Sequence, residues 1–270
     1  MTTMTITRPR YRLTAKGVLR AEWTKFWSLR SSWITLAVSL LLLIAFGVIA
    51  ALTYDPAGGF GDGPPGQSAA SDAISIVLTG VTFASLAIGV LGVLMSAGEY
   101  TTGSIRSTLA AVPSRLPVLW SKSLVFGVIA LVATGVGALA AFALGNPLLD
   151  SSLALGIGDS GVLRSLLGAG LYLGLVGVLG VALGALLRSS AGAITLLAGV
   201  LLIVPGLTSL LPDSWSDTIS PYLPSNAGSA VMTLTQTGDS LGPWAGLAVF
   251  AGWVALALAG AAYRMMRTDA

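Results

Sequence analysis

The sequence predicts an all-α membrane protein with six transmembrane helices. Only 9% of the 270 residues are charged and 54% are hydrophobic, whereas a soluble domain carries about 25% charged residues. Six apolar stretches are each long enough to cross a hydrocarbon core of about 30 Å, which takes roughly 20 helical residues. Lysine and arginine gather in alternate connecting segments. Residues 1–270 are therefore expected to form a single transmembrane domain.

The six apolar stretches contain no Asp, Glu, Lys or Arg. Helices are expected there because a lipid-embedded backbone must satisfy its hydrogen bonds internally. The first stretch is too long, and begins too far along the chain, for a cleaved signal peptide, so we expect a retained anchor. The expected spans are Trp33–Leu52, Ala73–Ala97, Leu124–Leu144, Ser165–Leu187, Ala191–Leu211 and Trp244–Tyr263.

Basic residues predict the orientation of these spans, since cytoplasmic segments are enriched in lysine and arginine. With six spans, 13 of the 14 basic residues fall on one side of the membrane, and Arg164 is the exception. Eight aspartates fall on the other side. Both termini are therefore expected to be cytoplasmic.

Residues 1–31 form the expected cytoplasmic arm, and the end of this arm has an amphipathic pattern. Four large apolar side chains share an arc of about 100° on a helix: Leu19, Trp23, Phe26 and Trp27. Lys25 lies on the opposite side of that helix. Tryptophan with basic residues beside a span is typical of an interfacial helix on the inner leaflet. A simple positively charged anchor is the alternative.

The connection between the second and third spans is the most specific segment for function. In it, Ile105 and Leu109 stand four residues apart on one face of a helix, with Arg106 beside them. A short amphipathic helix on the cytoplasmic side is expected to offer a docking surface for a soluble partner. The alternative is a plain turn in which Glu99 pairs with Arg106 or Arg115.

Two of the external segments differ in character. Residues 53–72 are rich in glycine, proline and serine, which is typical of a loop without regular structure. Residues 212–243 are too apolar for a solvated loop and too often interrupted by proline for a span. Short helices that partly re-enter the membrane are expected there, with Asn226 capping a helix through Ala227–Leu234.

Spans four and five contain residues with consequences for helix packing. Gly170 with Gly174, and Gly180 with Gly184, form pairs of small residues spaced for close helix approach. We expect these pairs to pack within the chain, with the lining of a cargo path as the alternative. Pro205 is expected to kink the fifth span.

The stretch Glu99–Lys122, EYTTGSIRSTLAAVPSRLPVLWSK, resembles the signature of ABC-2 type permeases. These proteins are the membrane subunits of one class of ATP-driven exporters. In that family, an E-(Y/F)-x-x-G-(T/S)-(I/L)-R pattern follows the second span, and a P-x-(R/S) turn and a lysine precede the third. Ala21–Trp33 is similar to the interfacial "elbow" of the family, and Leu223–Gly228 resembles a segment of its actinobacterial-type members.

The resemblance implies a multi-pass permease subunit of an ABC exporter in the bacterial plasma (inner) membrane. The segment Gly98–Leu109 would be a coupling helix that docks on a separate ATPase subunit, which would carry ATP and magnesium. Ser104 stands where many members of the family have threonine. The residues expected to couple to the ATPase are Glu99, Gly103, Ser104, Ile105, Arg106 and Leu109.

A second permease subunit, identical or a sister chain, would complete the transporter. Charge-free spans favour efflux of an amphipathic or lipophilic cargo such as a drug (as in multidrug efflux), an antibiotic or a lipid. Besides the lipid bilayer and these subunits, no nucleic-acid partner is expected. No cofactor or metal is expected on this chain, because it has neither cysteine nor histidine and no G-x-x-x-x-G-K-[S/T] run.

Other classes of function remain as alternatives. An ion-coupled secondary transporter normally needs ionisable residues at membrane depth, and the expected spans have none. An intramembrane enzyme would need a catalytic constellation, which the sequence does not show. A non-transporting membrane scaffold would also fit charge-free spans. The formal G-x-G-x-x-G match at Gly156–Gly161 has no strand before it, so we expect a simple lead into the fourth span.

Overall fold

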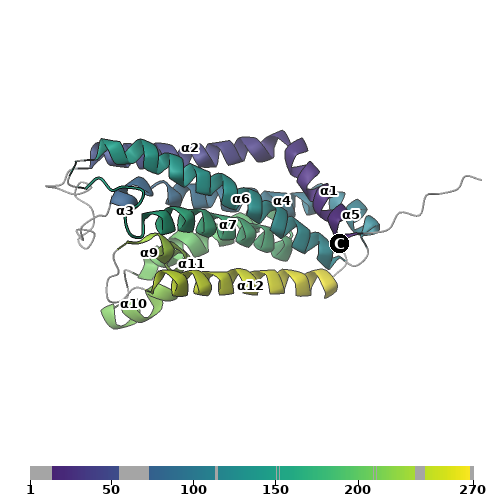
Figure 1. Ribbon diagram of the computed structural model, residues 1–270. Helices are drawn as coiled ribbons and strands as arrows, with labels where there is room; N and C mark the ends of the chain where they lie inside the picture. Colours follow the sequence, from purple (N-terminus) through teal and green to yellow (C-terminus); the bar gives the residue numbers. More distant parts are fainter. Residues whose placement is uncertain are drawn as a thin grey trace, which may run out of the picture.

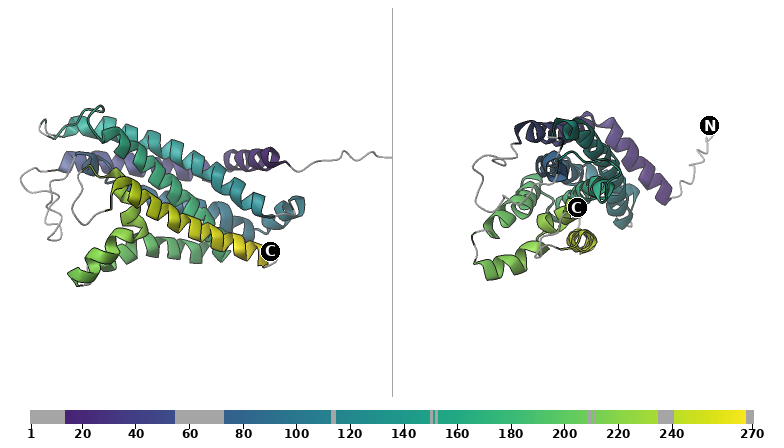
Figure 2. Two further views of the ribbon diagram at one scale, coloured as in Figure 1. Left: turned by 60° about the horizontal axis from the view of Figure 1, so that its bottom comes forward. Right: turned by 60° about the vertical axis from the view of Figure 1, so that its left-hand side comes forward.

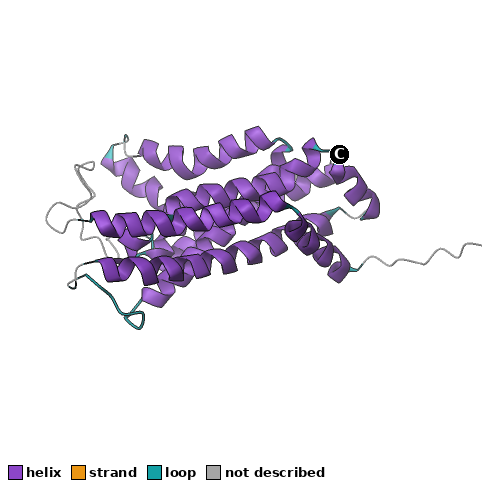
Figure 3. Cartoon of the chain, turned by 90° about the horizontal axis from the view of Figure 1, so that it is seen from above, coloured by secondary structure: helices purple, strands orange, loops and turns teal. Residues whose placement is uncertain are grey.

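The computed structural model is helical in every regular element that it describes (Figure 3). The described residues are 14–54, 73–112, 115–149, 151, 153–208, 210, 212–234 and 241–267. Six helices in these ranges are long and apolar enough to cross a membrane: Arg30–Thr53, Val81–Thr101, Leu116–Leu148, Val162–Leu187, Ser190–Thr208 and Pro243–Arg267. The chain thus has the architecture of a multi-pass membrane protein. Most of the loop expected at 53–72 lies outside the described residues.

The first and third spans are longer than expected. Helix α2 covers Arg30–Thr53, and α6 covers Leu116–Gly145, so α6 begins well before the expected Leu124. A proline in the first turn favours this early start, because it lacks only an N–H that has no partner there. The extension brings Lys122 inside the helix, where its charge is compensated by other helices.

The second span is not the continuous helix expected over Ala73–Ala97. It consists of α3 (Ala73–Val77), a turn, and α4 (Val81–Thr101). At the turn, the backbone lies so close to α2 that a Cβ on Gly80 would stand 2.2 Å from the Leu43 carbonyl oxygen. The break therefore occurs where two helix backbones approach each other closely.

Helix α7 (Val162–Leu187) is the central helix of the bundle, and 78% of its most apolar window is buried. It packs against α4, α6, α8 and α12 (Figure 1). A Cβ on Gly180 would lie 2.2 Å from the Gly89 carbonyl oxygen, and one on Gly170 would lie 2.8 Å from the Gly135 Cα. The expected packing of these glycines within the chain is confirmed.

The fifth span departs from α-helical geometry near Pro205. Helix α8 (Ser190–Ala198) leads into a π-helical turn, η2 (Gly199–Ile203), and then into α9 (Val204–Thr208). The amide before the proline donates to the Gly199 carbonyl oxygen, five residues earlier, instead of the usual four. Proline commonly distorts a helix because it lacks a donor and its ring crowds the preceding turn. The distortion lies where the sequence predicts a kink.

The segment between the fifth and sixth spans partly returns to the bundle. Its described residues form four short helices: α10 (Asp213–Ile219), η3 (Ser220–Tyr222), α11 (Pro224–Ser229) and η4 (Ala230–Met232). Helix α10 projects from the bundle (Figures 1 and 2), whereas α11 and η4 pack against α7 and α12 (Pro243–Arg267). Ala227 and Val231 are fully buried at that contact.

The expected capping role of Asn226 is wrong. Helix α11 begins at Pro224, so Asn226 lies inside the helix, and its Nδ2 donates to the Ser220 carbonyl and hydroxyl oxygens at 3.0 and 2.8 Å. Proline at the first helical position presets the backbone for a helix and fixes this earlier start. The expected helix Ala227–Leu234 is replaced by α11 and the 3₁₀ turn η4.

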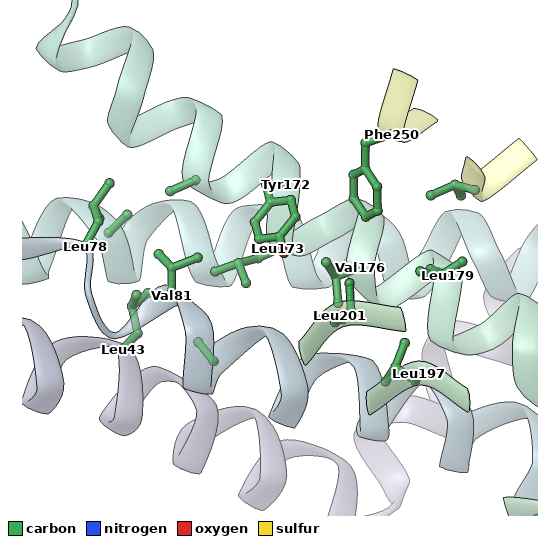
Figure 4. Close-up of a cluster of buried hydrophobic side chains, with 14 of the residues drawn as sticks. Leu43, Leu78, Val81, Tyr172, Leu173, Val176, Leu179, Leu197, Leu201 and Phe250 are labelled. Carbon is green, nitrogen blue, oxygen red and sulfur yellow. The ribbon is translucent and has the colours of Figure 1, made fainter. Parts of the chain in front are cut away.

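Two apolar clusters hold the bundle together. The larger surrounds α7, where Leu173, Val176 and Tyr172 meet side chains from neighbouring helices (Figure 4). The smaller is built around Phe26 and Phe126. Many large apolar side chains on the outer faces of α2, α6 and α12 are exposed, as expected of helices that face lipid.

Candidate functional site

The candidate site lies at the end of the bundle that carries α1 (Ala15–Ser28), α5 (Ser104–Ala111) and the last turn of α12, which we call the basic end (Figure 1). All the described lysines and arginines except Arg164 lie on elements that meet at this end. Both ends of the described chain, at Thr14 and Arg267, also lie here. The placement agrees with the charge pattern in the sequence.

Helix α1 leaves the axis of α2 at an angle, because Leu29 between them has an extended backbone (Figure 1). The expected apolar arc of α1 is divided between two environments. Phe26 is fully buried beside Phe126 of α6, with ring centroids 6.3 Å apart, and Leu19 packs on the same cluster. The Trp23 and Trp27 rings are about half exposed. One edge of α1 thus faces the bundle and another faces its surroundings.

A buried charge cluster joins α1, α4 and α6 at this end, and it consists of Glu22, Lys25, Glu99 and Lys122. The Lys122 Nζ donates to Glu22 Oε2 at 2.8 Å and to Glu99 Oε1 at 2.5 Å. The Lys25 Nζ also donates to Glu99 Oε1. Three of the side chains are almost inaccessible: Glu22 and Glu99 are 5% exposed and Lys122 is 4% exposed, whereas Lys25 is 31% exposed.

The two carboxylates and two ammonium groups balance in formal charge. This balance matters because a buried charge without a partner costs several kcal/mol. Glu99 receives both of its hydrogen bonds on one oxygen, and its Oε2 has no partner among the described residues. Glu99 therefore depends on both lysines, and α1 and α6 are held to the end of α4 through it.

The charge cluster corrects the sequence interpretation of Glu99. The alternative pairing of Glu99 with Arg106 or Arg115 is wrong, because the carboxylate points between α1 and α6 instead. Sequence reasoning also missed Glu22, and it named Lys122 only as the lysine that precedes the third span in the family signature. A signal for Glu22 was present: it stands four residues before the buried Phe26 and so shares the face that packs on the bundle.

Helix α5 follows directly on α4 through Gly103, which has a positive φ of 73° and open space around it. Ile105 is buried and Leu109 is half-buried, so these two side chains attach α5 to the bundle. Ser104 and Arg106 are exposed. The structure thus divides these residues between two edges of α5. The apolar edge is attached to the bundle, and the polar edge is free.

Two further interactions fix the basic end. The Arg188 guanidinium, at the end of α7, stacks over the Tyr100 ring at 5.1 Å from its centroid. The Arg115 Nη1, at the start of α6, donates to the Met265 carbonyl oxygen of α12 at 3.2 Å. The connections on either side of α5 are therefore tied to the neighbouring helices, whereas the polar edge of α5 is not covered.

The opposite end of the bundle contains the exceptional Arg164 and the glycine-rich segment before it. The Arg164 Nη2 donates to the Thr233 carbonyl oxygen at 2.8 Å. The Asp159 carboxylate accepts from the Gly156 amide at 2.7 Å, so it closes a local turn. Gly161 then begins α7 with a φ of 88°. The glycine pattern here makes a turn leading into α7, as expected.

Within the described ranges, no group of three or more His, Cys, Asp or Glu residues could hold a metal ion. In comparisons with known proteins, no family model and no curated protein matches the chain.

Proposed function

We propose that this chain is the permease subunit of an ATP-driven exporter of the ABC-2 type, and that its basic end faces the bacterial cytoplasm. The observation that carries the proposal is the free polar edge of α5. This helix follows directly on α4, which the buried charge cluster joins to α1 and α6. A partner bound there would act on a rigid part of the bundle. The resemblance of Glu99–Lys122 to the permease signature supports the same proposal.

In this mechanism, a separate ATPase subunit binds ATP and magnesium and docks on α5. Ser104 and Arg106 contact the ATPase, while Ile105 and Leu109 hold α5 to the bundle. Because Glu99 binds Lys25 and Lys122, a displacement of α5 moves α1, α4 and α6 together as one body. The closure of the ATPase is thereby converted into a movement of the spans.

The exposed faces of the chain indicate which parts of it contact lipid and which part contacts another subunit. Trp23 and Trp27 on the outer edge of α1 suit the headgroup region of the inner leaflet. The fifth span is the least buried, with 22% of its apolar window covered, so its outer face has room for a second permease subunit. Exposed apolar side chains elsewhere contact lipid.

A chain without cysteine allows a sharp test of the docking surface, because a single introduced thiol is the only one present. Ser104→Cys places it on the free edge of α5, and Ser151→Cys places it at the opposite end as the matched control. After crosslinking in native membranes, Ser104→Cys should capture a polypeptide that contains a G-x-x-x-x-G-K-[S/T] motif, and Ser151→Cys should not. Equal capture at both positions, or none at either, contradicts the proposal.

A charge reversal provides a functional measure at the same surface. Arg106→Glu is expected to lower the ATPase activity that co-purifies with the chain by at least about tenfold, since a charge-assisted contact becomes repulsive. Lys16→Glu, on the exposed start of α1, is the matched control and should leave that activity within about twofold. Unchanged activity in Arg106→Glu would refute the assignment of α5.

One observation favours a second candidate, an ion-coupled transporter. The expected spans are free of ionisable residues, but the observed α4 and α6 extend to include Glu99 and Lys122, which are buried. Ionisable groups inside membrane helices often mark ion pathways. Transport into vesicles driven by a proton gradient, without any ATPase, would support this second candidate.

A further inference from the structure

We propose that the cavity between α4, α7, η2 and α11 binds an uncharged amphiphile whose headgroup carries hydroxyl groups, such as an alkyl glycoside. As a cargo site, this assignment rests on the proposed function above. The cavity lies away from the basic end, and it is separate from the charge cluster and from α5.

The cavity has a volume of about 640 Å³, which falls within the usual range for small-molecule sites. Tyr172 of α7 lies between the start of α4, with Leu78 and Val81, and Leu201 of η2 (Figure 4). Pro205 and Ser225 complete the lining from α9 and α11. Four parts of the chain that are distant in sequence thus line one space.

One wall of the cavity offers hydrogen-bond acceptors. The hydroxyl groups of Thr79, Ser85 and Ser229 each donate to a carbonyl oxygen of the preceding turn, at 2.7, 2.7 and 3.1 Å. Their protons are thereby used. The Ser85 hydroxyl also hydrogen-bonds the Tyr172 side chain, whereas the lone pairs of Thr79 and Ser229 remain free to accept. Asn226 uses its amide nitrogen on Ser220 and keeps its carbonyl oxygen. A ligand that pairs with these acceptors must carry hydrogen-bond donors.

The Ser225 hydroxyl is an independent indication that the cavity has a group able to pair with a ligand. Its Oγ is buried and has no hydrogen-bond partner among the described residues, yet the residue lines the cavity. A buried hydroxyl without a partner costs free energy, and a turn of this side chain toward the cavity would let a ligand hydroxyl pair with it.

The charge and polarity of the lining residues further limit the chemical class of the ligand. None of the described residues that line the cavity is Asp, Glu, Lys or Arg, so a charged headgroup would enter without a counter-charge from them. Leu78, Leu201, Leu202 and Pro205 form an apolar wall that suits an alkyl chain. A neutral headgroup rich in hydroxyl donors, joined to an apolar tail, meets both walls.

The position of the π-helical turn connects this site to transport. Leu201 and Leu202 belong to η2, and Pro205 follows it, so the irregular part of the fifth span forms part of the wall. Irregular turns and prolines are places where helices bend. A bend there changes the volume of the cavity directly.

The test uses the protein in lipid nanodiscs with a photoactivatable octyl glucoside that carries a diazirine in its alkyl chain. Crosslinks mapped by mass spectrometry should concentrate on peptides that contain Tyr172, Leu201 or Met232. Unlabelled octyl glucoside should compete at least about tenfold better than octyl trimethylammonium or octyl sulfate, which have the same chain. Crosslinks spread evenly over the lipid-facing helices, or equal competition by all three headgroups, overturn the proposal.

Matched variants test the acceptor wall. Thr79→Val, Ser225→Ala and Ser229→Ala together remove acceptors with little change of shape, and they should weaken competition by the glucoside about tenfold. A control with Thr53→Val and Ser165→Ala changes hydroxyls outside the cavity and should alter it less than twofold. Equal effects in both sets would contradict a role for the wall.

The binding assay contains no ATPase, so its outcome is independent of the docking test at Ser104. Specific binding together with failed ATPase crosslinking would keep the cavity as a ligand site and refute the exporter assignment. Failed binding together with successful crosslinking would refute the cavity alone.

Discussion

Replacement of Lys122 by methionine tests whether the buried charge cluster fastens α1 and α6 to α4. The substitution keeps an unbranched side chain in the same space but removes the ammonium group. In the wild-type chain this group contacts Glu22 at 2.8 Å and Glu99 at 2.5 Å. In Lys122→Met, both buried carboxylates remain, and only Lys25, which is 31% exposed, is left to compensate them.

The expected loss of stability follows from this imbalance. Removal of one partner from a buried ion pair costs about 3–5 kcal/mol, because the remaining charge stays buried. Glu99 keeps one lysine, whereas Glu22 loses the only cation that contacts it among the described residues. We therefore expect Lys122→Met to lower the free energy of unfolding by about 3 kcal/mol. Glu22→Gln added to Lys122→Met restores the charge balance and should recover about 1–2 kcal/mol.

The assay is unfolding of the purified protein in detergent, followed by tryptophan fluorescence during heating and during titration with a denaturing surfactant. Lys16→Met is the matched control, since Lys16 lies on the exposed start of α1, and it should change stability by less than about 0.5 kcal/mol. Two results would refute the reasoning: Lys122→Met as stable as the control, or a double variant with Glu22→Gln that is less stable than Lys122→Met alone.

Two other predictions concern helix packing and the position of α1. Gly180→Ala would place a Cβ 2.2 Å from a carbonyl oxygen of α4, so we expect thermal unfolding to show a loss of about 2–3 kcal/mol, whereas Gly199→Ala, with open space around it, should be neutral. The second variant keeps only Trp23 and Trp27. Because both rings are exposed on α1, lipids brominated near the headgroup should quench tryptophan fluorescence more strongly than lipids brominated near the chain end. Stronger quenching by the deep bromines would contradict an interfacial helix.

The candidate site was predicted in part. The sequence indicated an amphipathic element around Ile105 and Arg106, and the structure shows a short helix there with one apolar edge attached and one polar edge free. The spacing of residues within one helix is sufficient for that prediction. The partners of Glu99 were not predictable in this way, because Lys25 and Lys122 are 74 and 23 residues away in sequence and meet Glu99 only when α1 and α6 pack against α4.

The sequence by itself determined the number of spans, their approximate positions and the end of the bundle at which the basic residues gather. It could do so because the thickness of the hydrocarbon core sets the length of each apolar segment, and the bias of lysine and arginine indicates on which side of the membrane each connecting segment lies. Tertiary structure alone decided the break before α4, the charge cluster and the cavity beside Tyr172. These features arise where helices distant in sequence approach one another: Gly80 against α2, Lys122 between two carboxylates, and Ser225 in the lining of the same cavity as Tyr172. Local patterns define helices, but only the packing of those helices determines which polar groups are buried together.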